Sequence, residues 1–167
     1  AKTKKPIIIS TGMASFAEIK YAYNKLRNYG CKNITILHCV SNYPAKLNDC
    51  NLSTIKKIKK KFKCKTGWSD HTKNSAVILR AIKKWSAELI EFHLDLDGKG
   101  NEYDFGHCWK PKEIEPLIRF VNGPHLYDGK PKVQLNKNEI TEQKWRRDAK
   151  DGFRPLLKTR RAFLINK

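Results

Sequence analysis

The sequence predicts an α/β protein with a parallel sheet covered by helices. Short apolar runs alternate with amphipathic stretches along the first two thirds of the 167 residues, which is the pattern of parallel strands joined by crossover helices. The apolar runs contain few polar residues, so they are expected to be buried on both faces. Taken alone, these two observations leave a doubly wound sheet and a β/α barrel as alternatives.

The first β/α unit has clear boundaries. Its strand is the apolar run from Pro6 to Ser10. Its helix begins at a capping box, in which the side chains of Ser15 and Glu18 each accept a hydrogen bond from the other residue's backbone N–H. Gly30 ends the helical pattern. The second unit then starts with a predicted strand from Ile34 to Cys39.

A lysine-rich helix follows the second strand. One side of this helix carries lysines, and the other carries an apolar stripe with helical spacing. The members of the stripe are Leu52, Ile55, Ile58 and Phe62. We interpret the lysines as a solvated helix face rather than as a nucleic-acid-binding patch.

Two further units complete the predicted sheet. A weaker strand is predicted around Lys65 to Ser69, and an amphipathic helix over residues 76–85 follows it. The fourth strand is predicted from Glu88 to Leu94 and leads into a long polar loop. Pro111 then opens a helix from Lys112 to Val121, because proline is favoured in a first helical turn.

The pattern changes after Gly123, so two parts are predicted. Residues 1–123 form the β/α domain, and residues 124–167 form a basic C-terminal extension. A polar helix is expected over Asn138 to Ala149, whereas the tail from Lys158 onward is given no predicted fold.

Charge, hydropathy and cysteine content narrow the class of protein. The chain has 35 Lys and Arg against 16 Asp and Glu, and its net charge of +19 can attract phosphates or nucleic acid. No apolar run approaches the roughly 20 residues that span a bilayer, and the chain opens without a signal-peptide pattern, so no membrane partner is expected. The five cysteines are odd in number and lack C-x-x-C spacing, which favours a reducing, cytoplasmic location.

Each predicted strand finishes in polar residues. Ser10 ends the first strand, Ser41 and Asn42 follow the second, and His71 and His93 come at the ends of the third and fourth. Ligands of β/α sheets bind at the carboxyl ends of the strands, where loops can converge. Imidazoles on two neighbouring strands can therefore bind one divalent metal, although each could instead be a core histidine bonded to backbone carbonyls.

Four separate stretches resemble the sialic acid synthases and their legionaminic and pseudaminic acid relatives. These enzymes condense phosphoenolpyruvate with an N-acetylated amino sugar. The matching stretches are Lys5 to Met13, Leu37 to Pro44, Gly67 to Thr72 and Ile90 to His93, in the family's order and spacing. The resemblance covers about residues 5 to 120 and implies a (β/α)8 TIM-barrel type of fold, with this chain supplying its second half.

The resemblance also implies a set of site residues. His71 and His93 match the two protein ligands of a divalent metal, usually manganese, with magnesium or cobalt as alternatives. With Asp104, which matches an aspartate that binds sugar hydroxyls, they form the implied catalytic set. The sequence around Asp104 departs from the commoner Gly-Pro-Asp-His. The implied substrate-binding residues are Ser10, Ser41, Asn42, Tyr43, Ser69 and Asp104.

Four β/α units account for only half of such a barrel. We therefore expect a partner, either a separate chain that carries the first half or a second copy of this chain. Two other functions are alternatives: a non-catalytic basic module that binds a polyanion, and another metal-dependent, aldolase-like enzyme. A nucleic-acid partner is not expected, because no zinc-finger, RRM or helix-turn-helix signature is found.

Overall fold

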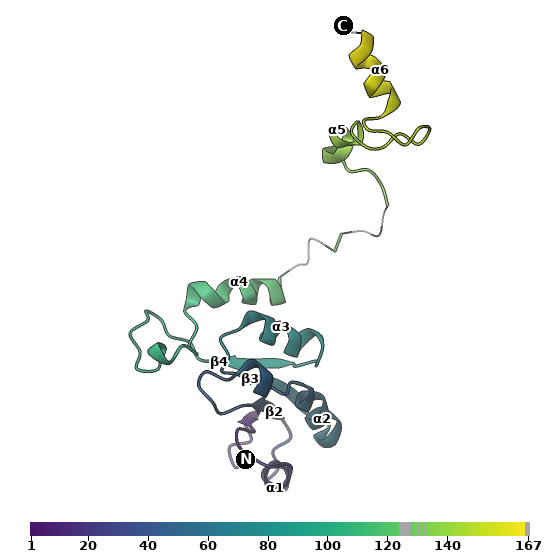
Figure 1. The fold of residues 1–167 in the computed structure, drawn as a ribbon. Coiled ribbons are helices and arrows are strands. Elements are labelled where there is room, and N and C mark those ends of the chain that lie inside the picture. The colour runs from purple at the N-terminus through teal and green to yellow at the C-terminus, as the bar shows by residue number, and fades with distance from the viewer. Residues whose placement is uncertain (124–127, 130, 132, 166–167) are drawn as a thin grey trace. The chain divides into compact units, whose positions relative to one another are not determined.

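The computed structural model describes residues 1–123, 128–129, 131 and 133–165. The chain divides into two compact units, Ala1–Pro124 and His125–Lys167. Figure 1 shows that the first unit contains the sheet and its helices, whereas the second is helical. Among the described residues, no helix has the length and apolar character needed to cross a membrane.

The first unit is built on a four-stranded parallel sheet. Its strands are β1 (Ile7–Ser10), β2 (Ile34–Cys39), β3 (Lys65–Asp70) and β4 (Leu89–Phe92), and they lie side by side in chain order. A doubly wound sheet reverses its strand order at a switch point, whereas a β/α barrel keeps the strands in sequence. The observed order is therefore that of a barrel segment, which confirms the fold that the family resemblance implies.

A helix follows each strand (Figure 1). The helices are α1 (Phe16–Asn28), α2 (Ser53–Phe62), α3 (Ser75–Lys83) and α4 (Pro111–Asn122). The capping box that begins α1 is present, which confirms this prediction. All four β/α units are thus in their predicted places, and the fold is α/β with a half barrel.

Alternate residues of each strand face opposite sides of the sheet. Ile36 of β2 and Trp68 of β3 are fully buried in clusters formed with helix side chains, so the strand residues on their face of the sheet point toward the helices. The strand residues at the intervening positions face the side that becomes the interior of a complete barrel. That side is open at the outer strand β1, where Ile8 is 52% exposed.

Gly67 lets β3 and β4 approach closely on the interior side. A Cβ atom at this position would lie 2.0 Å from the backbone oxygen of Leu89 and 2.7 Å from Leu37 Cδ2. Neither neighbour leaves room for a side chain. The glycine therefore preserves the pairing that aligns the ends of the two strands.

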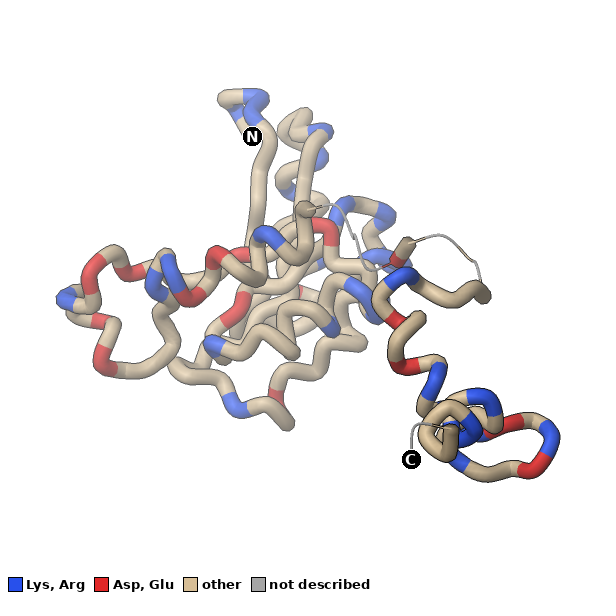
Figure 2. Tube along the Cα trace, turned by 90° about the horizontal axis from the view of Figure 1, so that it is seen from above, with Lys and Arg blue, Asp and Glu red and all other residues tan. Residues whose placement is uncertain are grey.

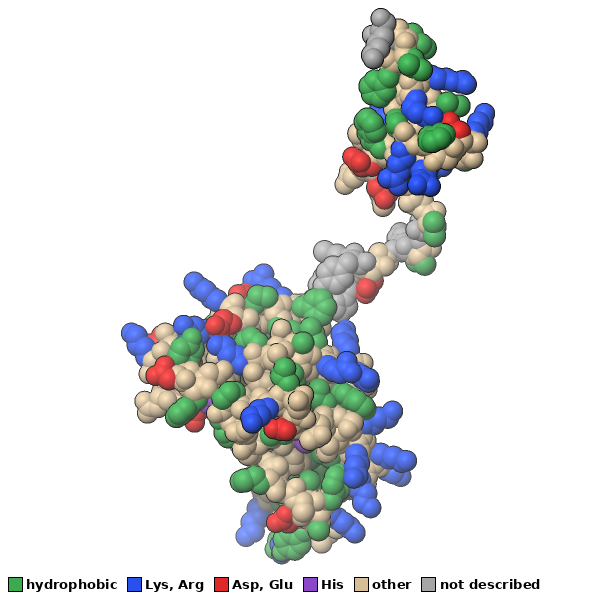
Figure 3. Space-filling model, viewed as in Figure 1, with side chains coloured by type: hydrophobic (Ala, Val, Ile, Leu, Met, Phe, Trp, Pro, Cys, Tyr) green, Lys and Arg blue, Asp and Glu red, His purple; other side chains and the backbone are tan. Residues whose placement is uncertain are grey.

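The lysine-rich helix is α2, and its amphipathic prediction is confirmed. All four members of its apolar stripe are buried. Figure 3 shows Lys and Arg side chains along the side of the first unit that α2 occupies. Part of the net positive charge is therefore a solvated helix face.

The second unit departs from the sequence prediction. Instead of one helix over Asn138 to Ala149, a 3-10 turn, η3 (Lys137–Glu139), leads into a short α5 (Ile140–Gln143). The Lys144 carbonyl, which in a continued helix would accept the Asp148 N–H, accepts the backbone N–H of Leu156 instead. The Asp148 carboxylate accepts the backbone N–H groups of Lys150 and Leu157, so the chain folds back on itself after α5. The basic tail then forms α6 (Leu157–Ile165), where no fold was predicted.

Candidate metal and substrate site

The two predicted metal ligands lie next to each other. His71 directly follows β3 and is buried, and His93 directly follows β4. Their ring centroids are 5.1 Å apart. The parallel register of β3 and β4 brings both imidazoles to the same end of the sheet, where the sequence predicts them.

Each of these imidazoles uses its Nδ1 atom in a hydrogen bond. His71 Nδ1 lies 2.7 Å from the Val40 carbonyl oxygen, and His93 Nδ1 lies 3.0 Å from Glu102 Oε2. A carbonyl or an ionised carboxylate can only accept, so Nδ1 is the donor in both rings. In a neutral imidazole, Nε2 then keeps a free lone pair. Both residues are therefore in the tautomer that a metal ligand needs.

Two more rings complete what we call the ring cluster, consisting of Tyr43, His71, His93 and His107. The Tyr43 ring centroid lies 4.2 Å from that of His71 and 5.0 Å from that of His107, and those of His93 and His107 are 4.7 Å apart. Tyr43 remains 45% exposed, so one side of the cluster is accessible to solvent. Burial nevertheless raises the pKa of the Tyr43 hydroxyl. It therefore stays protonated at neutral pH.

His107 is a buried histidine of the loop after β4 that the sequence analysis does not assign to the site. A histidine beside a free thiol in a loop would usually be incidental, but this side chain is 1% exposed, and among the described residues neither of its ring nitrogens has a hydrogen-bond partner. Burial, and then the nearby His93, lower the pKa of the His107 imidazole. The backbone N–H of Trp109 donates to the His93 carbonyl, which returns the loop to β4 and brings His107 beside His93. No local sequence motif predicts that the loop returns to β4.

Ser69 and Glu91 form a polar pair on the interior side of the sheet. They are directly opposed in the register of β3 and β4, and the Ser69 hydroxyl donates to Glu91 Oε1 at 2.7 Å. Sequence reasoning missed Glu91, although its position two residues before His93 places both side chains on the same face. Asp70 faces the helices instead, where it accepts hydrogen bonds from Trp68 Nε1 and Thr72 Oγ1.

The other predicted substrate-binding residues are exposed. Ser10 ends β1, and Ser41 and Asn42 lie in the loop after β2. A Cβ atom at Gly12 would lie 3.0 Å from Ser41 Oγ, so the loops after β1 and β2 approach closely. Asp104 lies in the 3-10 turn η2 (Tyr103–Phe105), and within the described part of the chain no hydrogen bond or ion pair joins it to the ring cluster.

The loop after β4 is acidic in an otherwise basic protein (Figure 2). Its fold depends on the Asp95 carboxylate, which accepts hydrogen bonds from the backbone N–H groups of Asp97, Gly98 and Gly100. These bonds lower the pKa of the Asp95 carboxyl group, and the bond from Gly98 has the largest effect. An ionised Asp95 thus shapes the loop that carries Glu102 to the histidines.

A sequential parallel half barrel with imidazoles and hydroxyls at its strand ends defines a TIM-barrel type of α/β protein with a polar site at the usual end. The model of the NeuB family matches residues 1–132, and the chain belongs to this family.

Relatives with known names support this assignment. The chain is 41% identical over 119 residues to the N,N'-diacetyllegionaminic acid synthase of Campylobacter jejuni, covering 70% of this chain and 35% of the relative. It is 40% identical over 145 residues to the pseudaminic acid synthase of Helicobacter pylori, and the match covers 87% of this chain and 42% of that relative.

A solved structure agrees with these relatives. The N-acetylneuraminic acid (sialic acid) synthetase of Leptospira borgpetersenii, in complex with citrate, superposes with a TM-score of 0.66 at 31% identity, covering 84% of this chain and 48% of that one. The chain therefore spans less than half the length of these relatives.

Proposed function

We propose that the chain takes part in the condensation of phosphoenolpyruvate with an N-acetylated amino sugar, similar to N-acetylmannosamine, to give a nonulosonic acid. The observation that carries the proposal is the pair His71 and His93: each Nδ1 is held by an acceptor, and within the part of the chain that the structure describes neither Nε2 makes a hydrogen bond. The relatives named above are acid synthases, which supports the same class of reaction.

The two histidines fit a divalent metal. We propose Mn²⁺, with Mg²⁺ and Co²⁺ as alternatives, and His71 and His93 as its protein ligands. Such an ion supplies Lewis acidity toward the aldehyde oxygen of the open-chain sugar. The chain's own contribution is to fix both imidazoles, through Val40 on one side and Glu102 on the other.

The remaining predicted residues then bind the substrates. In the proposed reaction, C3 of phosphoenolpyruvate forms a bond to the aldehyde carbon, water adds at C2, and phosphate leaves as the C2–O bond breaks. We assign the phosphate to the hydroxyls of Ser10, Ser41 and Ser69, with the Asn42 amide beside them. Tyr43 and Asp104 are assigned to the sugar.

A partner half barrel is part of the proposal. Strands β1 and β4 are the outer strands of the sheet, and a closed barrel requires both to pair. We propose that a chain with the first half of the barrel, or a second copy of this chain, supplies these strands. The exposed Ile8 on the interior side supports this requirement.

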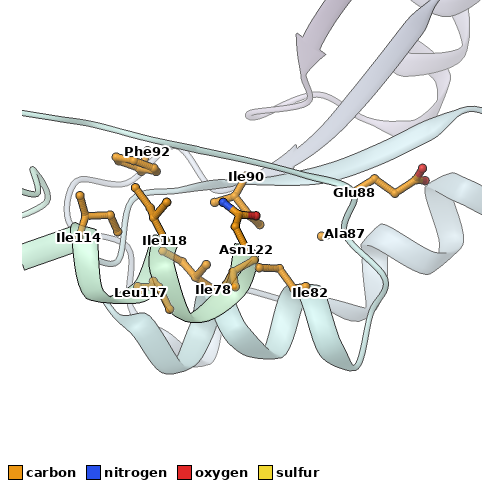
Figure 4. Close-up of a pocket in the computed structure, with 11 residues that line it drawn as sticks. Ile78, Ile82, Ala87, Glu88, Ile90, Phe92, Ile114, Leu117, Ile118 and Asn122 are labelled. Carbon is orange, nitrogen blue, oxygen red and sulfur yellow. The ribbon is translucent and has the colours of Figure 1, made fainter. Parts of the chain in front are cut away.

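An apolar pocket of about 330 Å³ near the outer strand β4 also supports a partner. Figure 4 shows Ile90 and Phe92 of β4 facing Ile114 and Ile118 of α4 across it. Its other lining residues include Ile78 and Ile82 of α3 and Leu117 of α4. Aliphatic surface of this kind is normally covered in a stable assembly.

Release of phosphate tests the reaction. The chain is incubated with phosphoenolpyruvate, N-acetylmannosamine and Mn²⁺, alone and together with the first half of the barrel of the C. jejuni relative produced as a separate fragment. We expect phosphate release in the mixture and its loss in His71→Ala. Ser53→Ala, an exposed position on α2, is the control. Mixtures that release no phosphate with any N-acetylated amino sugar would refute the proposal.

Mass in solution tests the partner. Light scattering is expected to give twice the 19.4 kDa of one chain, or a complex with the added fragment. A monomeric mass that does not change when the fragment is added would contradict both kinds of partner, the separate chain and the second copy. All five cysteines are free thiols, and we propose a reducing cytoplasm as the location.

A further inference from the structure

A second group of metal-ligating side chains lies beside the predicted pair. One donor atom from each of His93, Glu102, His107 and Cys108 can be chosen so that all four lie within 4.8 Å of one another. His71 is outside this group. Three of the four residues come from the loop after β4, and only His93 belongs to the metal pair of the proposed function.

We infer that this loop forms a binding site for a thiophilic transition metal of the Zn²⁺ class, with His93, Glu102, His107 and Cys108 as its ligands. We call these four residues the loop site. Two imidazoles, a thiolate and a carboxylate are the donor types that Zn²⁺ and Co²⁺ prefer, whereas Mn²⁺ and Mg²⁺ prefer oxygen.

The buried imidazole of His107 is the strongest argument for a bound ion. A polar group that is 1% exposed and has no hydrogen-bond partner normally costs free energy, because it loses its contact with water. Coordination of one ring nitrogen would remove that cost for the coordinated atom. His107 Nε2 lies 3.7 Å from Glu102 Oε2, so the unpartnered ring is directed at another member of the group.

The distances suit a small, four-coordinate ion. Bond lengths of about 2.0 to 2.3 Å put tetrahedral ligands about 3.5 Å apart, so the widest pair in the group must close by about 1 Å. His93 Nδ1 and Glu102 Oε2 are already 3.0 Å apart. The loop is held at both ends, by Asp95 and by Trp109, which leaves the small closing movement to side chains.

Proton balance is simple at this site. The Cys108 thiol is buried, and burial raises its pKa, so it carries a proton before the ion binds. Binding of a divalent ion releases this proton to solvent as the sulfur becomes a thiolate. In His93 the proton moves from Nδ1 to Nε2, with no net release. No oxidant or reductant is needed.

An ion in the loop site competes for His93 with an ion bound by His71 and His93. A neutral imidazole has one free lone pair, so His93 cannot serve an ion through Nε2 and another through Nδ1 at once. This consequence, unlike the site itself, rests on the proposed function. A Zn²⁺-class ion in the loop then removes one ligand from the catalytic metal.

Cobalt absorption tests the loop site without any assay of activity. Co²⁺ is titrated into the full chain under reducing conditions, and the thiolate-to-cobalt charge-transfer band is recorded. We expect the band in the unaltered chain, its loss in Cys108→Ser, and Co²⁺ affinity at least about tenfold lower in His107→Gln. The matched control, Cys64→Ser, alters a cysteine that is outside the group and should leave the band unchanged.

The variant His71→Ala separates this inference from the proposed function. The loop site predicts that His71→Ala keeps the cobalt–thiolate band, although phosphate release is lost. The inference is wrong if the unaltered chain shows no such band, if Cys108→Ser keeps it, or if His71→Ala removes it from a variant with unchanged circular dichroism. A chain that shows the band but never releases phosphate leaves the loop site standing and refutes only the proposed reaction.

Discussion

Ser69 on β3 and Glu91 on β4 are joined by a hydrogen bond of 2.7 Å across directly opposed positions of the sheet. The Ser69 side chain is almost fully buried, whereas Glu91 is exposed on the interior side. This bond connects the two strands that end in His71 and His93. It therefore stabilises the fold and the site together.

Replacement of Ser69 by Ala should lower the free energy of unfolding by about 1 kcal/mol, because one hydrogen bond to a carboxylate is lost. Urea unfolding of Ser69→Ala, Glu91→Ala and the double variant measures the coupling, which should be about 0.5 kcal/mol or more. Fully additive single effects would show that the two side chains do not interact.

Glu102 should control the affinity of the metal pair. Its carboxylate holds His93 at 3.0 Å, and loss of such a supporting partner typically costs about 10- to 100-fold in metal affinity. Glu102→Ala is expected to lose Mn²⁺ affinity by this factor in equilibrium dialysis. Asp97→Ala, in the same loop but without a contact to the rings, should bind Mn²⁺ normally. Equal affinities for the two variants would contradict the role of Glu102.

Stability should fall in mild acid because of His38. Burial lowers the pKa of this imidazole in the folded chain, although its Nε2 lies 2.8 Å from the Cys50 carbonyl oxygen. The imidazole of His38 has its ordinary pKa of about 6.5 in the unfolded chain. As the pH falls through this value, the unfolded chain binds more protons than the folded chain, so protonation favours unfolding.

The free energy of unfolding is thus expected to decline as the pH drops from neutral through this region. Chemical denaturation at a series of pH values measures the decline, and His38→Asn should make the profile flatter. A profile for His38→Asn that runs parallel to that of the unaltered chain would exclude His38 as the cause.

The capping box of α1 gives a test that does not involve the site. Ser15 Oγ accepts the backbone N–H of Glu18 at 3.3 Å, and Glu18 Oε2 accepts that of Ser15 at 2.7 Å. Ser15→Ala should destabilise the chain by about 1 kcal/mol, whereas Ser15→Asp should be nearly neutral. Thermal unfolding of both variants checks this, and equal melting temperatures for Ala and Asp would count against it.

Local patterns were sufficient to predict most of the first unit. Strand β2 has the bounds that the apolar run indicates, and α1 and α4 begin where a capping box and a proline indicate. The second unit was harder, because the chain folds back after α5 through bonds between residues far apart in the sequence, from Leu156 N–H to the Lys144 carbonyl and from Leu157 N–H to the Asp148 carboxylate. Such bonds leave no periodic pattern in the sequence.

The site was predictable where it depends on strand ends. His71 and His93 are adjacent because parallel strands finish at a common edge, which the pattern of apolar runs already implies. His107 and Glu102 were not predictable, because a long loop must return to β4 before either reaches His93. Closure of that loop depends on tertiary hydrogen bonds, not on local propensity.

In the described sheet each outer strand is paired on one side only, which also bears on how this protein would be controlled. Both β1 and β4 run in the same direction, so whatever completes the ring must enter with matching polarity on each side. If a separate polypeptide does so, the rate of product formation in the cell would follow the supply of that polypeptide. Gene dosage and co-expression would then set how much complete barrel is formed, with no need for a dedicated inhibitor.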